Sequence, residues 1–364
     1  MIRRRPLLSA IVIAGLAGAT ALGTPAAQAQ DEPFKVGFVY VGPVGDHGWT
    51  YQHDQGRLAL EEHFGDAVET TFVESVSEGA DAERVIRQMV ESGHDMIFTT
   101  SFGFMNATAA MAEQYPDVIF EHATGYKRAD NLATYLSTTY QGRYVSGFLA
   151  GEVSESGKIG YIASFPIPEV IRDINAVMLG LQAVRDDAEI SIIWVNTWYD
   201  PAKEAEAARV MIDQGVDVLI QHTDSPAAMQ VAQEEGVWAV GQASDMSRFG
   251  PDAHLTAVVN DWSPYYIERV KAAMDGTWET HDLWGGMAED IIIVTEIHPD
   301  VPEEVRKEGR AIADAIHDGS FHPFTGPIAN QDGEVMVPEG TTMTNEELAQ
   351  MNWYVQGIEG SLPQ

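Results

Sequence analysis

Three segments of the sequence place aromatic and amide side chains directly after apolar, β-branched runs. They are residues 42–51, residues 99–106 and residues 195–201. In an open α/β sheet the ligand crevice lies outside the carboxyl ends of the strands, where such segments would meet. Aromatic faces there can stack on a flat ligand, while amide groups hydrogen-bond to its edge. The pattern therefore predicts a binding crevice, with Trp49 and Trp198 as the preferred pair of stacking rings.

Residues of these segments and of two later strand ends are candidates for contact with a ligand. The alternative is that the rings only fill the crevice or pack on neighbouring helices. The candidates are Asp46, Trp49, Phe102, Phe104, Asn106, Asn196, Trp198, Gln242, Asp245 and Asn260.

Catalytic and cofactor chemistry has little support in the sequence. The loop at residues 42–51 contains a proline and an aspartate and lacks G-x-G-x-x-G, so it does not indicate a nucleotide cofactor. The nucleophile motif G-x-S-x-G is also absent. Asp245 and Asp261 could form a carboxylate pair for hydrolysis, but a predicted strand separates them. We therefore predict a binding protein without a cofactor, not an enzyme.

A metal site is not indicated either. The histidines His47, His53, His122 and His222 are possible metal ligands, but none belongs to a tight ligand pair such as H-E-x-x-H. The chain has no cysteine, which excludes disulfides and thiolate metal ligands. We expect these histidines to be hydrogen-bonding residues of the surface or the crevice.

The elements that must position the crevice residues alternate along the chain. Apolar runs that predict buried strands are separated by amphipathic stretches that predict helices. Such alternation is typical of an α/β fold with parallel sheets covered by helices on both faces. The strand runs are residues 35–41, 69–74, 96–100, 118–121, 159–163, 190–195, 216–220 and 237–240.

The chain is also expected to form two similar lobes. A helix, Gly, Asp and a buried strand recur at residues 93–98 and 215–220, and the length exceeds what one hydrophobic core usually supports. We expect the chain to cross between lobes within residues 136–157 and to return within 242–260. The predicted N-terminal lobe is 34–138 plus about 243–300, the C-terminal lobe is 139–242 plus about 301–330, and the tail is 331–364.

The N-terminus and the charge bear on location and partners. Three arginines, an apolar stretch and the triplet Ala27-Gln28-Ala29 predict a signal peptide over residues 1–29, cleaved after Ala29. Without a cysteine for lipid attachment, a free periplasmic protein is expected.

The formal net charge of −34 argues against nucleic acid as a partner, because binding to phosphates needs clustered Lys and Arg.

Several local patterns over residues 34–330 together resemble one known family. They are residues 45–49 (GDHGW), 115–120 (YPDVIF), 141–151 (QGRYVSGFLAG), 157–161 (GKIGY) and 198–204 (WYDPAKE). The resemblance is to the basic membrane protein family, whose characterised members are purine nucleoside receptors of ABC importers. It implies the type I periplasmic binding protein fold, with two doubly wound lobes, a hinge and a cleft between them. It further implies an ABC permease in the inner membrane as partner, and a purine slot lined by Trp49, Phe102 or Phe104, and Trp198.

Three positions differ from the family's nucleoside-binding pattern. Thr124 and Ala243 stand where those members carry aspartates, and Asn260 stands where they carry a lysine. In the nucleoside-binding members the aspartates and the lysine bind the ribose. Because this chain lacks them, we expect a purine base or a similar flat heterocycle as the ligand, captured by aromatic stacking and lobe closure. The alternatives are a purine nucleoside receptor of the same fold, a nucleoside-acting periplasmic enzyme, and a sensory module that docks on a receptor kinase.

Overall fold

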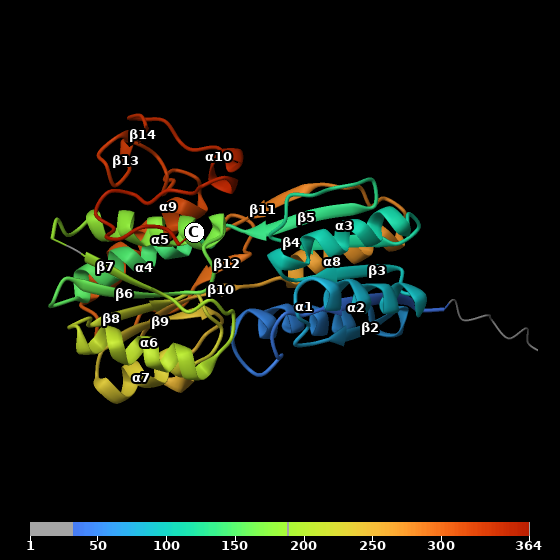
Figure 1. Ribbon diagram of the computed structural model, residues 1–364, viewed down its shortest axis with the longest axis horizontal. Coiled ribbons are helices and arrows are strands. Elements are labelled where there is room, and N and C mark those ends of the chain that lie inside the picture. Colours follow the sequence, from blue (N-terminus) through green and yellow to red (C-terminus); the bar gives the residue numbers. More distant parts are fainter. Residues whose placement is uncertain (1–31, 188, 364) are drawn as a thin grey trace, which may run out of the picture. The chain divides into compact units, whose positions relative to one another are not determined.

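The structure is a computed structural model that describes residues 32–187 and 189–363. Residues 33–364 form one compact unit that contains two six-stranded sheets, each with helices on both faces (Figure 1). The expected α/β architecture of two doubly wound lobes is confirmed. The predicted signal peptide, residues 1–29, lies outside the described residues.

The first lobe is built on a sheet in which every neighbouring pair of strands is parallel. Its strand order is β11-β5-β4-β3-β1-β2, and α1, α2, α3 and α8 belong to this lobe. The strands are β1 (Phe34–Val39), β2 (Val68–Val73), β3 (Met96–Thr99), β4 (Ile119–Ala123), β5 (Leu132–Ser137) and β11 (Asp282–Gly285). The helices are α1 (Gly48–Phe64), α2 (Ala80–Glu91), α3 (Met105–Gln114) and α8 (Ser263–Met274), with short 3-10 turns at Gly65–Ala67 (η1) and Phe102–Phe104 (η2).

The second lobe repeats this plan with one antiparallel strand at its edge. Its strand order is β12-β10-β9-β8-β6-β7, in which only β12 runs against its neighbour. The strands are β6 (Lys158–Ala163), β7 (Glu189–Trp194), β8 (Val218–Gln221), β9 (Trp238–Ala243), β10 (His254–Asn260) and β12 (Ile292–Val294). The helices are α4 (Tyr140–Val153), α5 (Pro168–Gln182), α6 (Pro201–Asp213), α7 (Ala227–Glu235) and α9 (Glu303–His317), with a 3-10 turn at Ser247–Phe249 (η3).

The central strands of both sheets are apolar on both faces. All four residues of β3 and all four of β8 are buried, as expected where helices cover a parallel sheet on either side. Helix α2 shows the matching pattern, because Val85, Ile86 and Met89 are buried on one face while its charged residues point outward. Burial of these faces determines the position of every strand end that borders the cleft.

The chain crosses between the sheets three times, which differs from the predicted domain boundaries. The crossings follow β5, β10 and β11. The sequence predicts that residues 243–300 return to the first lobe as one block. In the structure β10 and β12 pair in the second sheet, and only α8 and β11 lie in the first lobe. Residues 254–257 of β10 are buried, so this strand needs cover on both faces, which its place beside β9 provides. Apolar periodicity predicts such a strand but not the sheet that it joins.

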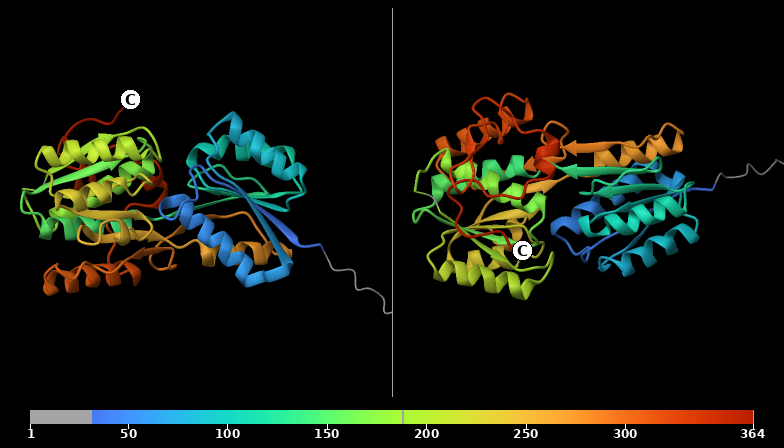
Figure 2. Two further views of the ribbon diagram at one scale, coloured as in Figure 1. Left: turned by 90° about the horizontal axis from the view of Figure 1, so that it is seen from below. Right: turned by 45° about the horizontal axis from the view of Figure 1, so that its top comes forward.

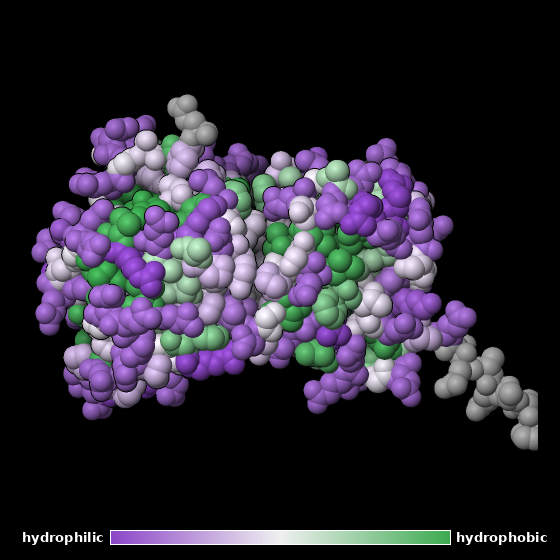
Figure 3. Space-filling view, turned by 60° about the horizontal axis from the view of Figure 1, so that its bottom comes forward, coloured by the Kyte–Doolittle hydropathy of each residue, from purple (hydrophilic) through white to green (hydrophobic). Residues whose placement is uncertain are grey.

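The C-terminal residues lie on the second lobe. They form β13 (Ile328–Ala329), β14 (Val335–Val337) and α10 (Asn345–Ala349), which Figure 2 shows in red over that lobe. Ile358 forms a bridge to Ile190 of β7, and Asn175 of α5 binds the carbonyl oxygen of Trp353. The tail thereby covers the edge of the second sheet. The face seen in Figure 3 is mostly hydrophilic, in line with the high net charge.

Candidate functional site

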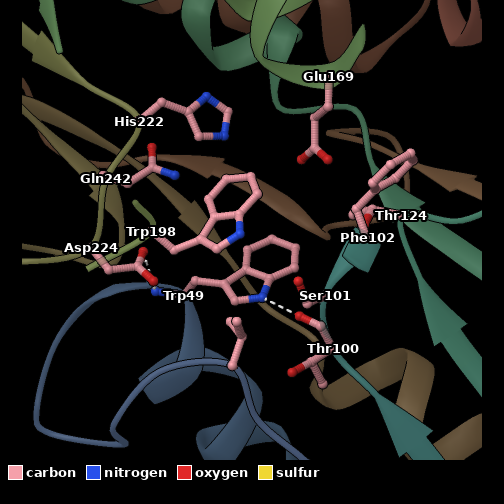
Figure 4. A pocket seen from close by; sticks show the side chains of 11 residues that line it. Trp49, Thr100, Ser101, Phe102, Thr124, Glu169, Trp198, His222, Asp224 and Gln242 are labelled. Carbon is pink, nitrogen blue, oxygen red and sulfur yellow. Dashed lines mark hydrogen bonds between the residues drawn. The ribbon is translucent and has the colours of Figure 1, made fainter. Parts of the chain in front are cut away.

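A cavity lies between the carboxyl ends of the strands of the two sheets (Figure 4). The first lobe contributes Val41, Trp49, Thr100, Ser101, Phe102 and Thr124. The second lobe contributes Glu169, Trp198, His222, Asp224 and Gln242. The cavity is therefore shared between lobes, at the edge where the ligand crevice of an α/β sheet is expected.

Strand ends position almost every lining residue. In the first lobe, Thr100 directly follows β3 and Thr124 directly follows β4. In the second, His222 directly follows β8 and Gln242 is the second-last residue of β9. Glu169 differs because it lies in the first turn of α5. Parallel strands end at one edge of each sheet, so residues far apart in sequence meet around one cavity.

The two tryptophan rings are held by hydrogen bonds to the protein. Trp49 Nε1 donates to the carbonyl oxygen of Thr100 at 2.7 Å, and Trp198 Nε1 donates to Oε1 of Glu78 at 3.3 Å. The Trp49 ring also packs edge-on against Trp262 and His53. Because both indole N–H groups have partners, the rings offer mainly their faces to a ligand.

Two carboxyl groups of the cavity wall hold protons more strongly than usual. Burial raises the pKa of Asp224 to about 7; the Trp49 backbone N–H opposes the rise, and the Glu204 carboxylate adds to it. Burial also raises the pKa of Glu169 to about 7, against the nearby Arg172. Near neutral pH these side chains can accept or donate a hydrogen bond.

The histidine of the wall is neutral. Burial and the charges of Arg143 and Arg172 lower the pKa of His222 well below its usual value. The lining residues of the described chain include no Lys or Arg. Such a wall favours a neutral ligand that can donate hydrogen bonds over an anion.

A buried arginine behind the wall orients Gln242. Arg143 is fully buried and donates to Oε1 of Gln242 and, at 2.8 Å, to the carbonyl oxygen of Gln221. Its charge is balanced by Asp173, whose Oδ2 lies 3.6 Å from Arg143 Nε. Since Oε1 of Gln242 is occupied, its Nε2 group is available as a donor to the cavity, toward which Figure 4 shows it pointing.

Comparison with known proteins assigns the family. Residues 34–317 match the family model described as ABC transporter substrate-binding protein PnrA-like. The chain belongs to this family. A purine-binding protein of Brucella abortus (strain 2308) is 51% identical over 97% of this chain and 100% of its own length. A putative ABC transporter glucose-binding protein of Haloferax volcanii is 36% identical over 92% of this chain and 82% of the relative.

Solved structures show the same fold at low sequence identity. A solute-binding protein of an ABC transporter system from Aeropyrum pernix K1 superposes with a TM-score of 0.69 at 20% identity, covering 88% of this chain and 98% of that one. A second, from Conexibacter woesei, gives 0.65 at 22% identity over 79% and 97%. The type I periplasmic binding fold is thereby confirmed. The family match confirms the resemblance to the basic membrane protein family.

Members of this family are substrate-binding proteins of transporters, which agrees with the expectation that the chain is not an enzyme. Within residues 32–187 and 189–363, no helix is long and apolar enough to cross a membrane. The same residues contain no group of three or more His, Cys, Asp or Glu that could hold a metal ion.

Four of the ten residues predicted to contact the ligand line the cavity. They are Trp49, Phe102, Trp198 and Gln242. Asn196 lies beside it, in a neighbouring hollow that also contains Trp198 and Phe165. Asn260 is buried nearby, where its backbone carbonyl oxygen accepts from Nε2 of Gln52 at 2.8 Å.

The other four predicted residues lie away from the cavity. Phe104 is fully buried in the first lobe's core, because the 3-10 turn of residues 102–104 rotates its ring away from that of Phe102. Asn106 is exposed and accepts from Lys127 Nζ. Asp245 is exposed and accepts from the backbone N–H of Ser247. Asp46 is exposed and forms an ion pair with Arg248 at 2.5 Å.

Seven lining residues were not among the ten candidates. They are Val41, Thr100, Ser101, Thr124, Glu169, His222 and Asp224. The signal for Asp224 and His222 was present, since both follow the predicted strand at residues 216–220. That strand end carries no aromatic ring, so the aromatic signal that identifies the other crevice segments is absent from it.

Proposed function

We propose that this chain is a periplasmic receptor that captures a purine base or a similar flat heterocycle between its lobes and hands it to an ABC permease in the inner membrane. The observation that carries the proposal is the composition of the cavity wall. It combines the rings of Trp49, Phe102 and Trp198 with a few polar groups that converge from the second lobe. The name of the Brucella relative, a purine-binding protein at 51% identity, supports the same ligand class.

The polar groups match the edge of a base that carries both donors and acceptors. Nε2 of Gln242 can donate, while the carboxyl groups of Glu169 and Asp224 can accept from ring or amino N–H groups. A neutral base buries no net charge beside these carboxyls, whereas an anion would be repelled. Stacking would contribute most of the affinity and the edge groups the selectivity.

A base is favoured over a nucleoside by the three positions that differ from the family pattern. Thr124 offers a hydroxyl to the cavity, and neither Ala243 nor Asn260 lines it. The ribose-gripping carboxylates and lysine are thus replaced by weaker groups. One feature favours the nucleoside alternative: a second hollow adjoins the first, shares Phe102, Thr124 and Glu169 with it, and could hold a sugar.

Export and docking complete the proposal. The signal peptide expected over residues 1–29 would deliver the chain to the periplasm. Closure of the lobes around the base would create the outer surface that the permease recognises, so ligand binding and docking would be linked through one conformational equilibrium.

Isothermal titration of the secreted protein tests the ligand class. The panel contains adenine, guanine, hypoxanthine, xanthine, their nucleosides and glucose, the last because of the name of the Haloferax relative. We expect binding of one or more bases and at least tenfold weaker binding of the matching nucleoside. Tighter binding of nucleosides would favour the second candidate, and binding of glucose alone would overturn the purine assignment.

A further inference from the structure

Helix α1 of the first lobe begins without a cap from its own segment. Its N-cap residue, His47, makes no side-chain hydrogen bond to the helix, and the first turn carries no acidic residue. The first four N–H groups of any helix need partners outside it, and a side chain just before the helix normally supplies one. The partners of this 17-residue helix therefore have to come from elsewhere.

Two side chains of the second lobe cap the helix by accepting hydrogen bonds from its first N–H groups. The backbone N–H of Gly48 donates to Oγ of Ser244 at 2.7 Å, and that of Trp49 donates to Oδ1 of Asp224 at 3.0 Å. Asp224 follows β8 and Ser244 follows β9, so both lie at strand ends of the other sheet. The helix is capped from across the cleft.

The backbone at the contact is shaped for a close approach. Gly48 has a φ of +80°, which favours glycine, and a Cβ placed there would lie 2.7 Å from the carbonyl oxygen of Asp224. Gly48 and Ser244 are both buried. The adjacent ion pair between Asp46 and Arg248 is largely exposed and adds little, so the two caps dominate this corner of the cleft.

We infer that Ser244, together with Asp224, is a positioning residue for ligand capture: it caps α1 only while the lobes are closed, and so stabilises the closed cleft without touching the ligand. The inference rests on the proposed capture by lobe closure. When the lobes part, the N–H groups of Gly48 and Trp49 pass to water. The ring of Trp49 lines the cavity, so the same contact also sets the position of one stacking face.

Ser244 provides the cleaner test, because Asp224 also lines the cavity. The variants are Ser244→Ala, which removes the acceptor, and Ser244→Thr, which keeps a hydroxyl. The matched control is Ser146→Ala, which removes a buried hydroxyl that bonds only within α4. Adenine and guanine serve as probes, and stopped-flow mixing gives the association and dissociation rates.

We expect Ser244→Ala to release the bound base about fivefold faster with a smaller change in association, since a lost cap costs about 1 kcal/mol. Ser244→Thr should restore most of the slow release, and Ser146→Ala should match the unaltered chain. Equal release rates for Ser244→Ala and Ser146→Ala would overturn the inference.

Closure can also be measured without any ligand. Because the chain has no cysteine, dyes on Glu62→Cys in α1 and Glu206→Cys in α6 report the distance between lobes unambiguously. Ser244→Ala should lower the closed fraction, and an unchanged fraction would overturn the inference. If no purine binds the unaltered chain, the proposed function fails, while this comparison still decides the role of Ser244.

Discussion

The wall that the first lobe contributes to the cavity carries no ionisable side chain among the described residues, whereas the second lobe contributes two carboxyl groups and a histidine. The first lobe offers rings and hydroxyls, supported by an aromatic core around Trp262 and Tyr266. The second offers Glu169, Asp224 and His222, supported by buried charges. Both lobes contribute a stacking ring, because Trp198 belongs to the second lobe, so the difference lies in the ionisable groups. It teaches that a two-lobed receptor can concentrate the recognition of the ligand's edge on one side of the cavity.

Each lobe also contains a buried ion pair, but only one pair lies behind the cavity wall. In the second lobe Arg143, which is paired with Asp173, donates to Gln242 of the wall. In the first lobe Arg269 donates to Glu121 at 2.6 Å, beside Tyr265 and Trp278 and away from the cavity. These two pairs allow stability and binding to be separated.

The largest effect is expected when each arginine is replaced by methionine. Arg143→Met and Arg269→Met should each lower the free energy of unfolding by about 3 to 5 kcal/mol, because each leaves a buried carboxyl group without its partner. Only Arg143→Met should also weaken ligand binding, by about tenfold, since Gln242 loses the bond that orients its amide. Urea unfolding and titration measure the two quantities. Equal losses of ligand affinity in both variants would show that the ion pair behind the cavity wall has no specific role in binding.

Removal of a stacking ring should have the next largest effect, on binding alone. Trp198→Ala should weaken affinity by about 5- to 150-fold, which corresponds to about 1 to 3 kcal/mol for a base stacked on an aromatic ring. The neighbouring Tyr199 is exposed and does not line the cavity, so Tyr199→Ala is the matched control. If both variants bind as the unaltered chain does, Trp198 only fills the cleft.

Two buried groups, one in each lobe, should make the stability of the protein depend on pH in opposite directions. Asp224, which faces Glu204 and the Trp49 N–H, has its pKa raised by burial from its usual value near 4 to about 7. Its contribution to stability is therefore present at low pH and is lost as the pH rises from about 4 to about 7. In the first lobe burial lowers the pKa of His122 to about 3. That contribution is present above about 6.5 and is lost as the pH falls toward 3.

Melting temperatures of two variants test these signs. Relative to the unaltered chain, Asp224→Asn should gain stability at pH 8 and lose that advantage at pH 5, since the amide has no charge to bury. His122→Gln should show its smaller deficit at pH 5 and its larger one at pH 8. Curves that run parallel to that of the unaltered chain between pH 5 and pH 8 would contradict the burial of either group.

Much of this arrangement follows from the sequence. The alternation of apolar runs and amphipathic stretches predicts two parallel lobes, and the rule that ligands meet strand ends identifies Trp49, Phe102, Trp198 and Gln242. The same rule applies to Asp224, which lies in the loop after β8. The aromatic residues that indicate the other crevice segments are absent from this loop, so the sequence does not single out Asp224.

What could not be predicted depends on local geometry and on long-range pairing. Phe102 and Phe104 are equally good candidates from the sequence, because both follow the same predicted strand. Only the 3-10 turn places one at the cavity and the other in the core. The sheet that β10 joins is decided by its pairing with β9, which leaves no trace in its own periodicity. Asp46 lies in the predicted crevice segment at residues 42–51, yet its carboxylate forms an ion pair with Arg248.

Asp46 should therefore give the smallest effect of the residues considered. Its side chain is 59% exposed, and an ion pair at such a site contributes about 0 to 1 kcal/mol. Asp46→Asn should change ligand affinity by less than about fivefold, and the change should disappear at high salt because exposed charges are screened. Titration in low and high salt measures this. A loss that persists at high salt and matches that of Trp198→Ala would restore Asp46 as a ligand contact, and would show that the first lobe does contribute a charge to recognition.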